Sequence, residues 1–501
     1  MPWLSILMGV SVLGALGVTL VRNDKLAKQF TLGVSLIVLA LAVAMAVQFS
    51  PNGDKFQFTE KYDWIPDFGV HYAVGVDGIA LVLILLSVVL VPIVVLASWH
   101  DAEAGKRSVR TYFSLMLVLE AMMIGVFAAT DVFLFYVFFE AMLIPMYFMI
   151  GSYGGAQRSY AAVKFLLYSL FGGLLMLVAV IALYSIAGKN TFMFPDLVGT
   201  IQDVTTQKWL FLGFFIAFAI KAPLWPFHTW LPDAAAQAPA GAAVLLVGVL
   251  DKVGTYGMLR FCLELFPDAS KYFTPLVITL SVIGIVYGAI VAIGQTDMKR
   301  LIAYTSVSHF GFIALGVFAM TTNAGAGATL YMVNHGFSTG ALFLIAGFLI
   351  QRRGSQFIAD YGGVQKVAPV LAGTFLVAGL SSLSLPGLST FVSEFMVLVG
   401  TYQKYLVPAV IATTGVILAA IYILWMYQRT MNGPTAESVK HLPDLNAREK
   451  WVVAPLVALL LVFGFYPKPL LDVIHPAVKN TLSSVPATDP APAVQVAEEA
   501  K

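Results

Sequence analysis

Long uninterrupted runs of apolar residues follow one another along almost the whole chain, separated by short polar segments. A helix needs about 20 apolar residues to cross about 30 Å of hydrocarbon. The pattern therefore predicts an all-α polytopic membrane protein with about 14 transmembrane helices. The predicted helices are 2–21, 29–48, 78–98, 111–130, 132–150, 161–187, 209–235, 240–260, 274–294, 299–320, 328–350, 367–402, 407–428 and 451–466.

Two segments do not fit the pattern of a span. Residues 52–76 combine aromatic residues, short alternations and turn residues, which predicts a β-hairpin on the outer face of the membrane. Residues 485–501 are rich in proline, alanine and acidic residues, which predicts a disordered tail. The remaining residues, 1–484, are expected to form a single membrane domain.

Two of the predicted helices contain residues that interrupt a helix. In helix 7, three prolines follow Lys221 at positions 223, 226 and 232, and in helix 12 Pro386 and Gly387 precede Glu394. Proline removes a backbone donor and breaks the ladder of helical hydrogen bonds. Because unwound backbone at membrane depth is tolerated only beside a polar cavity, both breaks indicate functional positions.

The order of the helices suggests a duplication. Helices 4–8 (111–262) and helices 9–13 (274–428) form two groups of five, and the fourth helix of each group is the broken one. A unit with an odd number of helices enters the membrane in the opposite direction when it is repeated. We therefore expect two inverted repeats, an architecture typical of transporters. Helices 1–3 with the hairpin (1–110) and the last helix (451–466) lie outside the repeats.

Composition agrees with a membrane protein and excludes several functions. Hydrophobic residues make up 59% of the chain and charged residues 11%, against about 25% charged in a typical soluble domain. The net charge of +2 argues against nucleic acid as a partner. One cysteine, Cys262, excludes an internal disulfide and a cysteine-ligated iron–sulfur cluster or structural zinc. We expect no cofactor and no metal in this chain.

Basic residues predict the orientation of the chain. Most of the 29 Lys and Arg residues fall in the loops after helices 1, 3, 5, 9, 11 and 13. Positive loops remain on the cytoplasmic side, so both termini are expected on the non-cytoplasmic side of the membrane.

Six titratable residues lie far from the ends of the predicted helices. A charged side chain that faces lipid at the midplane costs about 2.5–3.5 kcal/mol, so these groups are expected to face one another or water. A row of carboxylates, amines and imidazoles at one depth is what lateral proton transfer requires. The six residues are Glu140, Lys221, Lys252, His309, His335 and Glu394, with Glu120 as a secondary candidate.

Structural interpretations of these residues remain open. A single buried pair such as Glu140–Lys221 also fits a clamp between helices, and a lone histidine more often packs by hydrogen bonding than carries protons. Asp251 precedes Lys252 and points about 100° away around the helix, and one interpretation is that it only neutralises the lysine. Four residues near span ends are assigned solvated structural roles: Asp131, His228, Asp233 and Arg260.

Several long motifs resemble one family of membrane proteins. They are FFEAMLIPMYFMIG (138–151), KAPLWPFHTWLPDAAAQAP (221–239), DKVGTYGMLRF (251–261), GQTDMKRLIAYTSVSHFGF (294–312), NHGFSTGALF (334–343) and LPGLSTFVSEF (385–395). Together they resemble the antiporter-like membrane subunits of respiratory complex I, the proton-pumping NADH–quinone oxidoreductase. Within this family the chain is more similar to the M-type chains, the counterparts of mitochondrial subunit 4, than to the L and N types. The two features that favour the M type are Glu394 in helix 12 and the predicted total of 14 helices.

The resemblance implies a role for each of the six residues. Glu140 and Lys221 would form an ion pair that gates a half-channel, and Lys252 would be the central proton carrier. His309 and His335 would lead to the second half-channel, with Glu394 at its connection. The chain would be a translocase subunit in an energy-transducing membrane, most simply the bacterial cytoplasmic membrane. Its partners would be lipids and the other membrane subunits, especially chains L and N, and other subunits would hold flavin, iron–sulfur clusters and quinone.

Two other functions remain alternatives. Mrp-type cation/proton antiporters and membrane-bound hydrogenases share the fold and the charged positions that the resemblance implies. The second alternative is a scaffold that only clamps neighbouring chains, in which case substitution of Glu140 or Lys221 would impair assembly as much as pumping.

Overall fold

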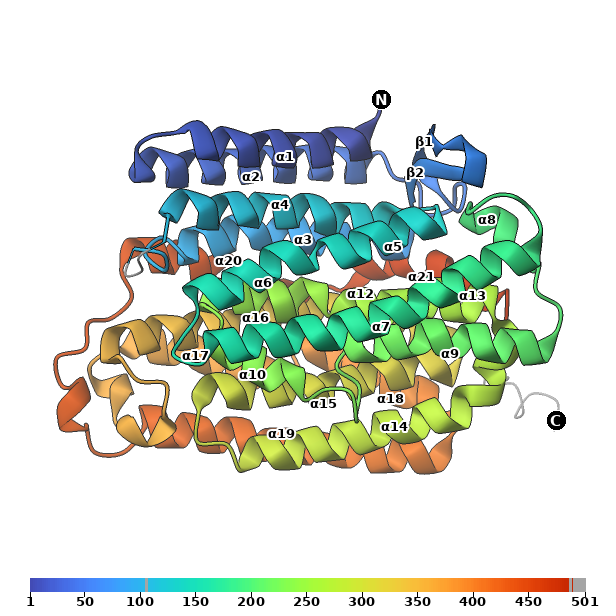
Figure 1. The fold of residues 1–501 in the computed structure, drawn as a ribbon. Coiled ribbons are helices and arrows are strands. Elements are labelled where there is room, and N and C mark those ends of the chain that lie inside the picture. The colour runs from blue at the N-terminus through green and yellow to red at the C-terminus, as the bar shows by residue number, and fades with distance from the viewer. Residues whose placement is uncertain (104–106, 486–488, 490–501) are drawn as a thin grey trace.

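The computed structural model describes residues 1–103, 107–485 and 489. Helices with nearly parallel long axes lie side by side (Figure 1). The chain is an all-α multi-pass membrane protein, as its pattern predicts. Its first half contains α1 (Trp3–Leu20), α2 (Asp24–Val47), α3 (Gly78–Ala97), α4 (Val109–Ala128), α5 (Val132–Ala141), α6 (Leu143–Tyr153), α7 (Arg158–Ala187), α8 (Phe194–Leu197), α9 (Val204–Lys221) and α10 (Trp230–Gln237).

The second half continues the bundle with further helices. They are α11 (Ala240–Leu245), α12 (Lys252–Gly257), α13 (Leu263–Leu265), α14 (Pro267–Ile293), α15 (Met298–Ala319), α16 (Thr322–Arg353), α17 (Pro369–Ser382), α18 (Ser389–Tyr402), α19 (Leu406–Met431), α20 (Ala447–Phe465) and α21 (Lys468–Leu482). Within the described residues, 12 helices are long and apolar enough to span a membrane, or 13 if α20 and α21, bent by 68°, form one span. The helices α17 and α18 occupy the remaining predicted span, 367–402, so the total of 14 stays a prediction.

The predicted hairpin is confirmed. Strands β1 (Gln57–Ile65) and β2 (Val70–Val76) pair antiparallel, with Tyr62 opposite Tyr72. A turn with left-handed Gly69 joins them. The hairpin packs at one end of the bundle, beside the start of α1 (Figure 1).

Several helices begin earlier than their apolar pattern predicts, because polar caps precede the apolar run. Asn23 accepts hydrogen bonds from the first backbone amides of α2, which starts at Asp24 instead of residue 29. Asn446 and Glu449 form a reciprocal capping box that starts α20 at Ala447 instead of residue 451. Hydropathy alone places helix ends at the edge of the apolar run and misses these turns.

One predicted helix is divided in the structure, and one helix of the structure was not predicted. The predicted helix 132–150 is divided at Met142 into α5 and α6. Pro145 has no amide to donate to Ala141, four residues earlier, which accounts for the break. The amphipathic helix α21 follows the last predicted span and was not predicted. The predicted disordered tail, 485–501, lies almost entirely outside the described residues.

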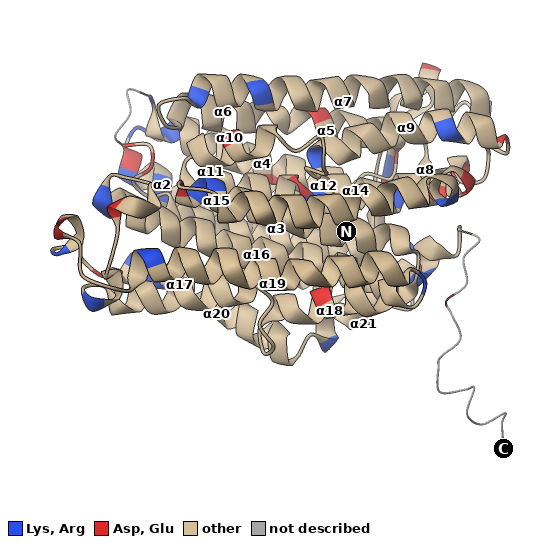
Figure 2. Ribbon diagram, turned by 90° about the horizontal axis from the view of Figure 1, so that it is seen from below, with Lys and Arg blue, Asp and Glu red and all other residues tan. Residues whose placement is uncertain are grey.

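Both predicted helix interruptions are present. The helix α9 ends at Lys221, and eight residues separate it from α10. The helix α17 ends at Ser382, and α18 begins at Ser389, five residues before Glu394. Charged residues gather at helix ends and in the connecting loops, and few lie along the middle of the spans (Figure 2). The grouping into two inverted repeats stays a prediction.

Candidate functional site: a row of titratable side chains

The first two members of the row lie on different helices beside the break in α9. Lys221 is the last residue of α9 and is 1% exposed. Its ammonium lies 4.6 Å from the ring centroid of Phe139, next to Glu140 on α5, at a distance where the ring stabilises a cation. Among the described side chains, no nitrogen–oxygen distance of 4.0 Å or less joins Glu140 and Lys221. The two charges interact electrostatically without the ion-pair contact that the resemblance implies.

A glycine of α7 accommodates the carboxylate of Glu140. A Cβ atom built on Gly173 would overlap the Oε1 atom of Glu140. Glycine is therefore the residue that lets α7 approach this side chain closely. The carboxylate is half-buried, and its Oε1 atom has no hydrogen-bond partner within the described part of the chain.

Lys252 forms the centre of the row. It is fully buried and begins α12, and Asp251 separates it from a π-helical stretch over Leu246–Leu250. Its ammonium donates to the carbonyl oxygen of Val247 at 2.5 Å and lies 2.7 Å from Nδ1 of His335 on α16. A π-helical turn inside an α-helix is often found at functional sites. Here it supplies a backbone acceptor for the central lysine.

From His335 the row continues across α15 to the second broken helix. The rings of His335 and His309 are 5.2 Å apart between centroids, and the ring of His309 lies 5.8 Å from that of Tyr331. The hydroxyl of Tyr331 donates to Oε2 of Glu394 at 2.6 Å. The same oxygen accepts from the hydroxyl of Ser384 at 2.8 Å. Lys252 and Glu394 are thus linked by side chains that are all almost completely buried.

Side chains from neighbouring elements hydrogen-bond to the backbone at both breaks. The indole nitrogen of Trp230 donates to the carbonyl oxygen of Ile220 in the last turn of α9, at 2.9 Å. Across the second break, the amide of Asn334 on α16 donates to the carbonyl oxygen of Ser389 at 2.8 Å. The last carbonyls of a helix lack partners inside the helix. Trp230 therefore satisfies one of these carbonyls at the end of α9, whereas Asn334 joins α16 to the first residue of α18.

Sequence analysis missed three polar residues of the row. Tyr331 lies one helical turn before His335, a spacing that places both on one face of α16. Ser384 lies in the break itself, with a left-handed φ of +62°, which is uncommon for a residue other than glycine. Tyr422 on α19 makes a longer contact, 3.4 Å from its hydroxyl to Nε2 of His309. Nothing in the apolar sequence around Tyr422 signals this contact.

The secondary candidate and the span-end residues have structural contacts. Glu120 on α4 is fully buried and accepts a hydrogen bond from Ser11 on α1 at 3.1 Å. The predicted solvated positions of Asp131, His228 and Arg260 are wrong, since each is 2% exposed or less. Asp131 caps α5 at Leu134, and Arg260 pairs with Asp77 and Glu264. Folding buries Asp131 beneath the hairpin, where it accepts from the His71 amide, Arg260 beside Asp77 and Glu264, and His228 against Tyr287 and Tyr304.

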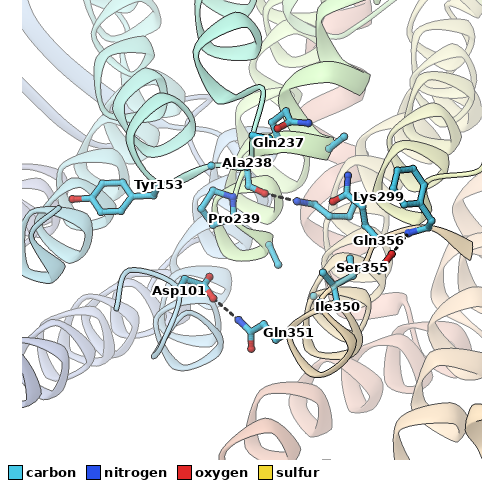
Figure 3. Close-up of a pocket in the computed structure, with 18 of the residues that line it drawn as sticks. Asp101, Tyr153, Gln237, Ala238, Pro239, Lys299, Ile350, Gln351, Ser355 and Gln356 are labelled. Carbon is cyan, nitrogen blue, oxygen red and sulfur yellow. Dashed lines mark hydrogen bonds between the residues drawn. The ribbon is translucent and has the colours of Figure 1, made fainter. Parts of the chain in front are cut away.

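A cavity of about 790 Å³ opens at one end of the bundle, beside the end of α16 (Figure 3). There Lys299 donates to the carbonyl oxygen of Ala238, and Gln351 donates to Asp101 at 2.6 Å. Burial raises the pKa of Asp101, which lies in the loop after α3. The six predicted residues do not line this cavity. In the part of the chain that the structure describes, no group of three or more His, Cys, Asp or Glu side chains could hold a metal ion.

An interrupted-helix bundle with titratable groups at membrane depth defines an antiporter-like membrane subunit. Two family profiles match the chain: "NADH-ubiquinone oxidoreductase chain 4, amino terminus" over residues 4–126 and "NADH:quinone oxidoreductase/Mrp antiporter, TM" over residues 129–421. NADH-quinone oxidoreductase subunit M of Mycobacterium tuberculosis is 54% identical, over 98% of this chain and 96% of the relative. The chain belongs to the subunit M family of NADH-quinone oxidoreductases.

Two solved structures have the same fold. A chain of respiratory complex I from Thermus thermophilus with bound NADH superposes with a TM-score of 0.89, at 32% identity over 97% of this chain and all of that chain. A chain of the Mrp complex from Dietzia sp. DQ12-45-1b superposes with a TM-score of 0.86, at 20% identity over 96% and 97% of the two chains. The second likeness concerns the fold alone.

Proposed function

We propose that protons move through this chain along the buried row from Glu140 to Glu394. The chain is an antiporter-like, proton-translocating membrane subunit of NADH-quinone oxidoreductase. The observation that carries the proposal is the continuity of contacts from Lys252 through His335, His309 and Tyr331 to Glu394. Six separate helices contribute these groups, so the row runs across the bundle instead of along one helix.

Glu140 and Lys221 act as the switch at one end of the row. A nearby carboxylate favours the charged form of a buried lysine, and its withdrawal favours release of the proton. No nitrogen–oxygen distance of 4.0 Å or less joins the two groups among the described side chains, and we assign this arrangement to the state in which Lys221 passes on its proton. Closing the pair would return the lysine to its holding state.

The row connects two half-channels, one in each of the predicted repeats, 111–262 and 274–428. Protons enter one half-channel, cross through the row, and leave by the other. The driving force comes from quinone reduction in other subunits, which hold the flavin, iron–sulfur clusters and quinone. The sibling antiporter-like chains L and N are neighbours in the membrane arm. The chain lies in the bacterial cytoplasmic membrane with both termini on the non-cytoplasmic side.

The decisive experiment replaces Glu140 in the intact complex. Glu140→Gln keeps the size of the side chain and removes its charge. We expect a complex that assembles normally on a native gel while proton pumping per NADH oxidised largely collapses. The matched control is Glu437→Gln, since the side chain of Glu437 is 84% exposed and forms an ion pair with nearby Lys440. Intact pumping by Glu140→Gln would contradict the proposed role of Glu140 and Lys221 as a switch.

The scaffold alternative is tested by Lys221→Met in the same membranes. A residue that only clamps helices together would reduce assembly and pumping in parallel. We expect assembly to be retained and pumping to fall. A parallel loss of both would favour the scaffold.

A further inference from the structure

The row has a gap between its two lysines. In the described structure, no hydrogen bond joins Lys221 to Lys252 or to another member of the row. Lys252 is instead directed toward Val247 and His335. A proton that leaves the Glu140–Lys221 pair therefore needs a further group to reach Lys252.

Asp251 lies at this gap. It is fully buried, between the π-helical stretch Leu246–Leu250 and α12. Neither of its carboxylate oxygens has a hydrogen-bond partner among the described residues. Burying a carboxyl group without a partner is costly, and a buried polar group left unsatisfied in a native structure requires an explanation.

The packing of α12 turns Asp251 toward the end of α9. A Cβ on Gly254 would lie 2.5 Å from the carbonyl oxygen of Phe218 and 2.6 Å from Ala222, the residue that follows Lys221. Asp251 is three residues before Gly254 and shares its face of the helix. The carboxylate interacts electrostatically with both Lys221 and Lys252.

We propose that Asp251 is a proton relay between Lys221 and Lys252. The proposal rests on the proposed function of the row and adds a residue to it. The ammonium of Lys221 transfers a proton to the carboxylate of Asp251, leaving a neutral amine and a carboxylic acid. The acid then transfers that proton to the neutral amine of Lys252, which restores the carboxylate. No electrons move, and the number of protons is conserved.

The test compares Asp251→Asn and Asp251→Glu in the assembled complex in membrane vesicles. Asparagine has nearly the same shape as aspartate but cannot carry a proton, whereas glutamate can. We expect Asp251→Asn to assemble and to lower the number of protons pumped per NADH oxidised severalfold. We expect Asp251→Glu, which keeps the carboxylate, to pump nearly as well as the wild type. Wild-type pumping in Asp251→Asn would overturn the relay.

An infrared measurement separates a relay from a fixed counter-charge. A carboxyl group that is protonated during turnover gives a C=O stretching band in the difference spectrum, and the band should be absent in Asp251→Asn. A spectrum that is identical in wild type and Asp251→Asn would overturn the proposal. Lys221→Met serves as the reference: if it abolishes pumping while Asp251→Asn does not, only the relay fails. If Lys221→Met pumps normally, the proposed function itself fails.

Discussion

The carboxylate of Glu394 is held by two hydroxyl groups, one from Tyr331 and one from Ser384. Both hydrogen bonds are buried inside the bundle. A hydrogen bond to a charged group contributes about 1.5–3 kcal/mol, and a buried acceptor that loses its donor is penalised further. The environment of Glu394 therefore depends on Tyr331 and Ser384, which sequence analysis did not identify as candidate site residues.

Tyr331→Phe tests that environment. The substitution removes only the hydroxyl, so we expect normal assembly and a fall in pumping of at least about tenfold, as the loss of about 1.5 kcal/mol or more implies. Pumping per NADH oxidised in vesicles measures the effect. Tyr256→Phe is the control, because its equally buried hydroxyl donates to a backbone carbonyl, that of Phe127, at 3.0 Å. Equal effects of the two variants would contradict a special role for Tyr331.

Gly173→Ala tests the position of Glu140 without changing any titratable group. The added methyl group would overlap the carboxylate, so Glu140 must move away from its place beside Lys221. We expect pumping to fall as it does in Glu140→Gln while NADH oxidation by the complex continues. Gly33→Ala on α2 is the matched control, since a Cβ there meets nothing within 4 Å. Normal pumping by Gly173→Ala would show that the position of the carboxylate is not critical.

At the scale of elements, the sequence predicts where the helices are interrupted. The hydrogen bonds at the interruptions come from side chains on neighbouring elements. The prolines after Lys221 and before Glu394 predict where α9 and α17 end. The bonds from Trp230 to Ile220 and from Asn334 to Ser389 could not be predicted, because each donor lies on another element. The division of α5 from α6 was missed, although Pro145 was visible in the sequence.

A buried ion cluster joins several elements at the hairpin end of the bundle. Glu264 accepts hydrogen bonds from Arg260 at 3.1 Å and from Thr481 of α21 at 2.9 Å, and it also pairs with Lys55. Removing one partner from a buried pair costs about 3–5 kcal/mol. We expect Glu264→Gln to lower the unfolding temperature of the purified complex and to loosen α21. Glu437→Gln, at an exposed pair, is expected to leave that temperature unchanged.

At the scale of the whole molecule, the basic residues in the loops predict the orientation of the chain in the membrane. The single cysteine, Cys262, is fully buried, so the wild-type chain provides a clean background for labelling. We expect a membrane-impermeant maleimide to label Lys189→Cys from the non-cytoplasmic side of intact cells. Glu437→Cys, in an exposed loop after α19, should react only in inverted vesicles. The opposite result for both variants would reverse the predicted orientation.

The sequence by itself determined that the chain crosses the membrane many times and where two helices are interrupted, and it predicted which titratable residues lie near the midplane. The physical reason is that lipid tolerates only apolar residues and satisfied backbone, so each exception is visible along the chain. The tertiary structure alone decided which of those residues meet. It separated Glu140 from Lys221, joined Lys252 to His335, and brought Tyr331 and Ser384 to Glu394. Helices in lipid are apolar on both the buried and the lipid-facing sides, so the sequence does not reveal which faces pack together.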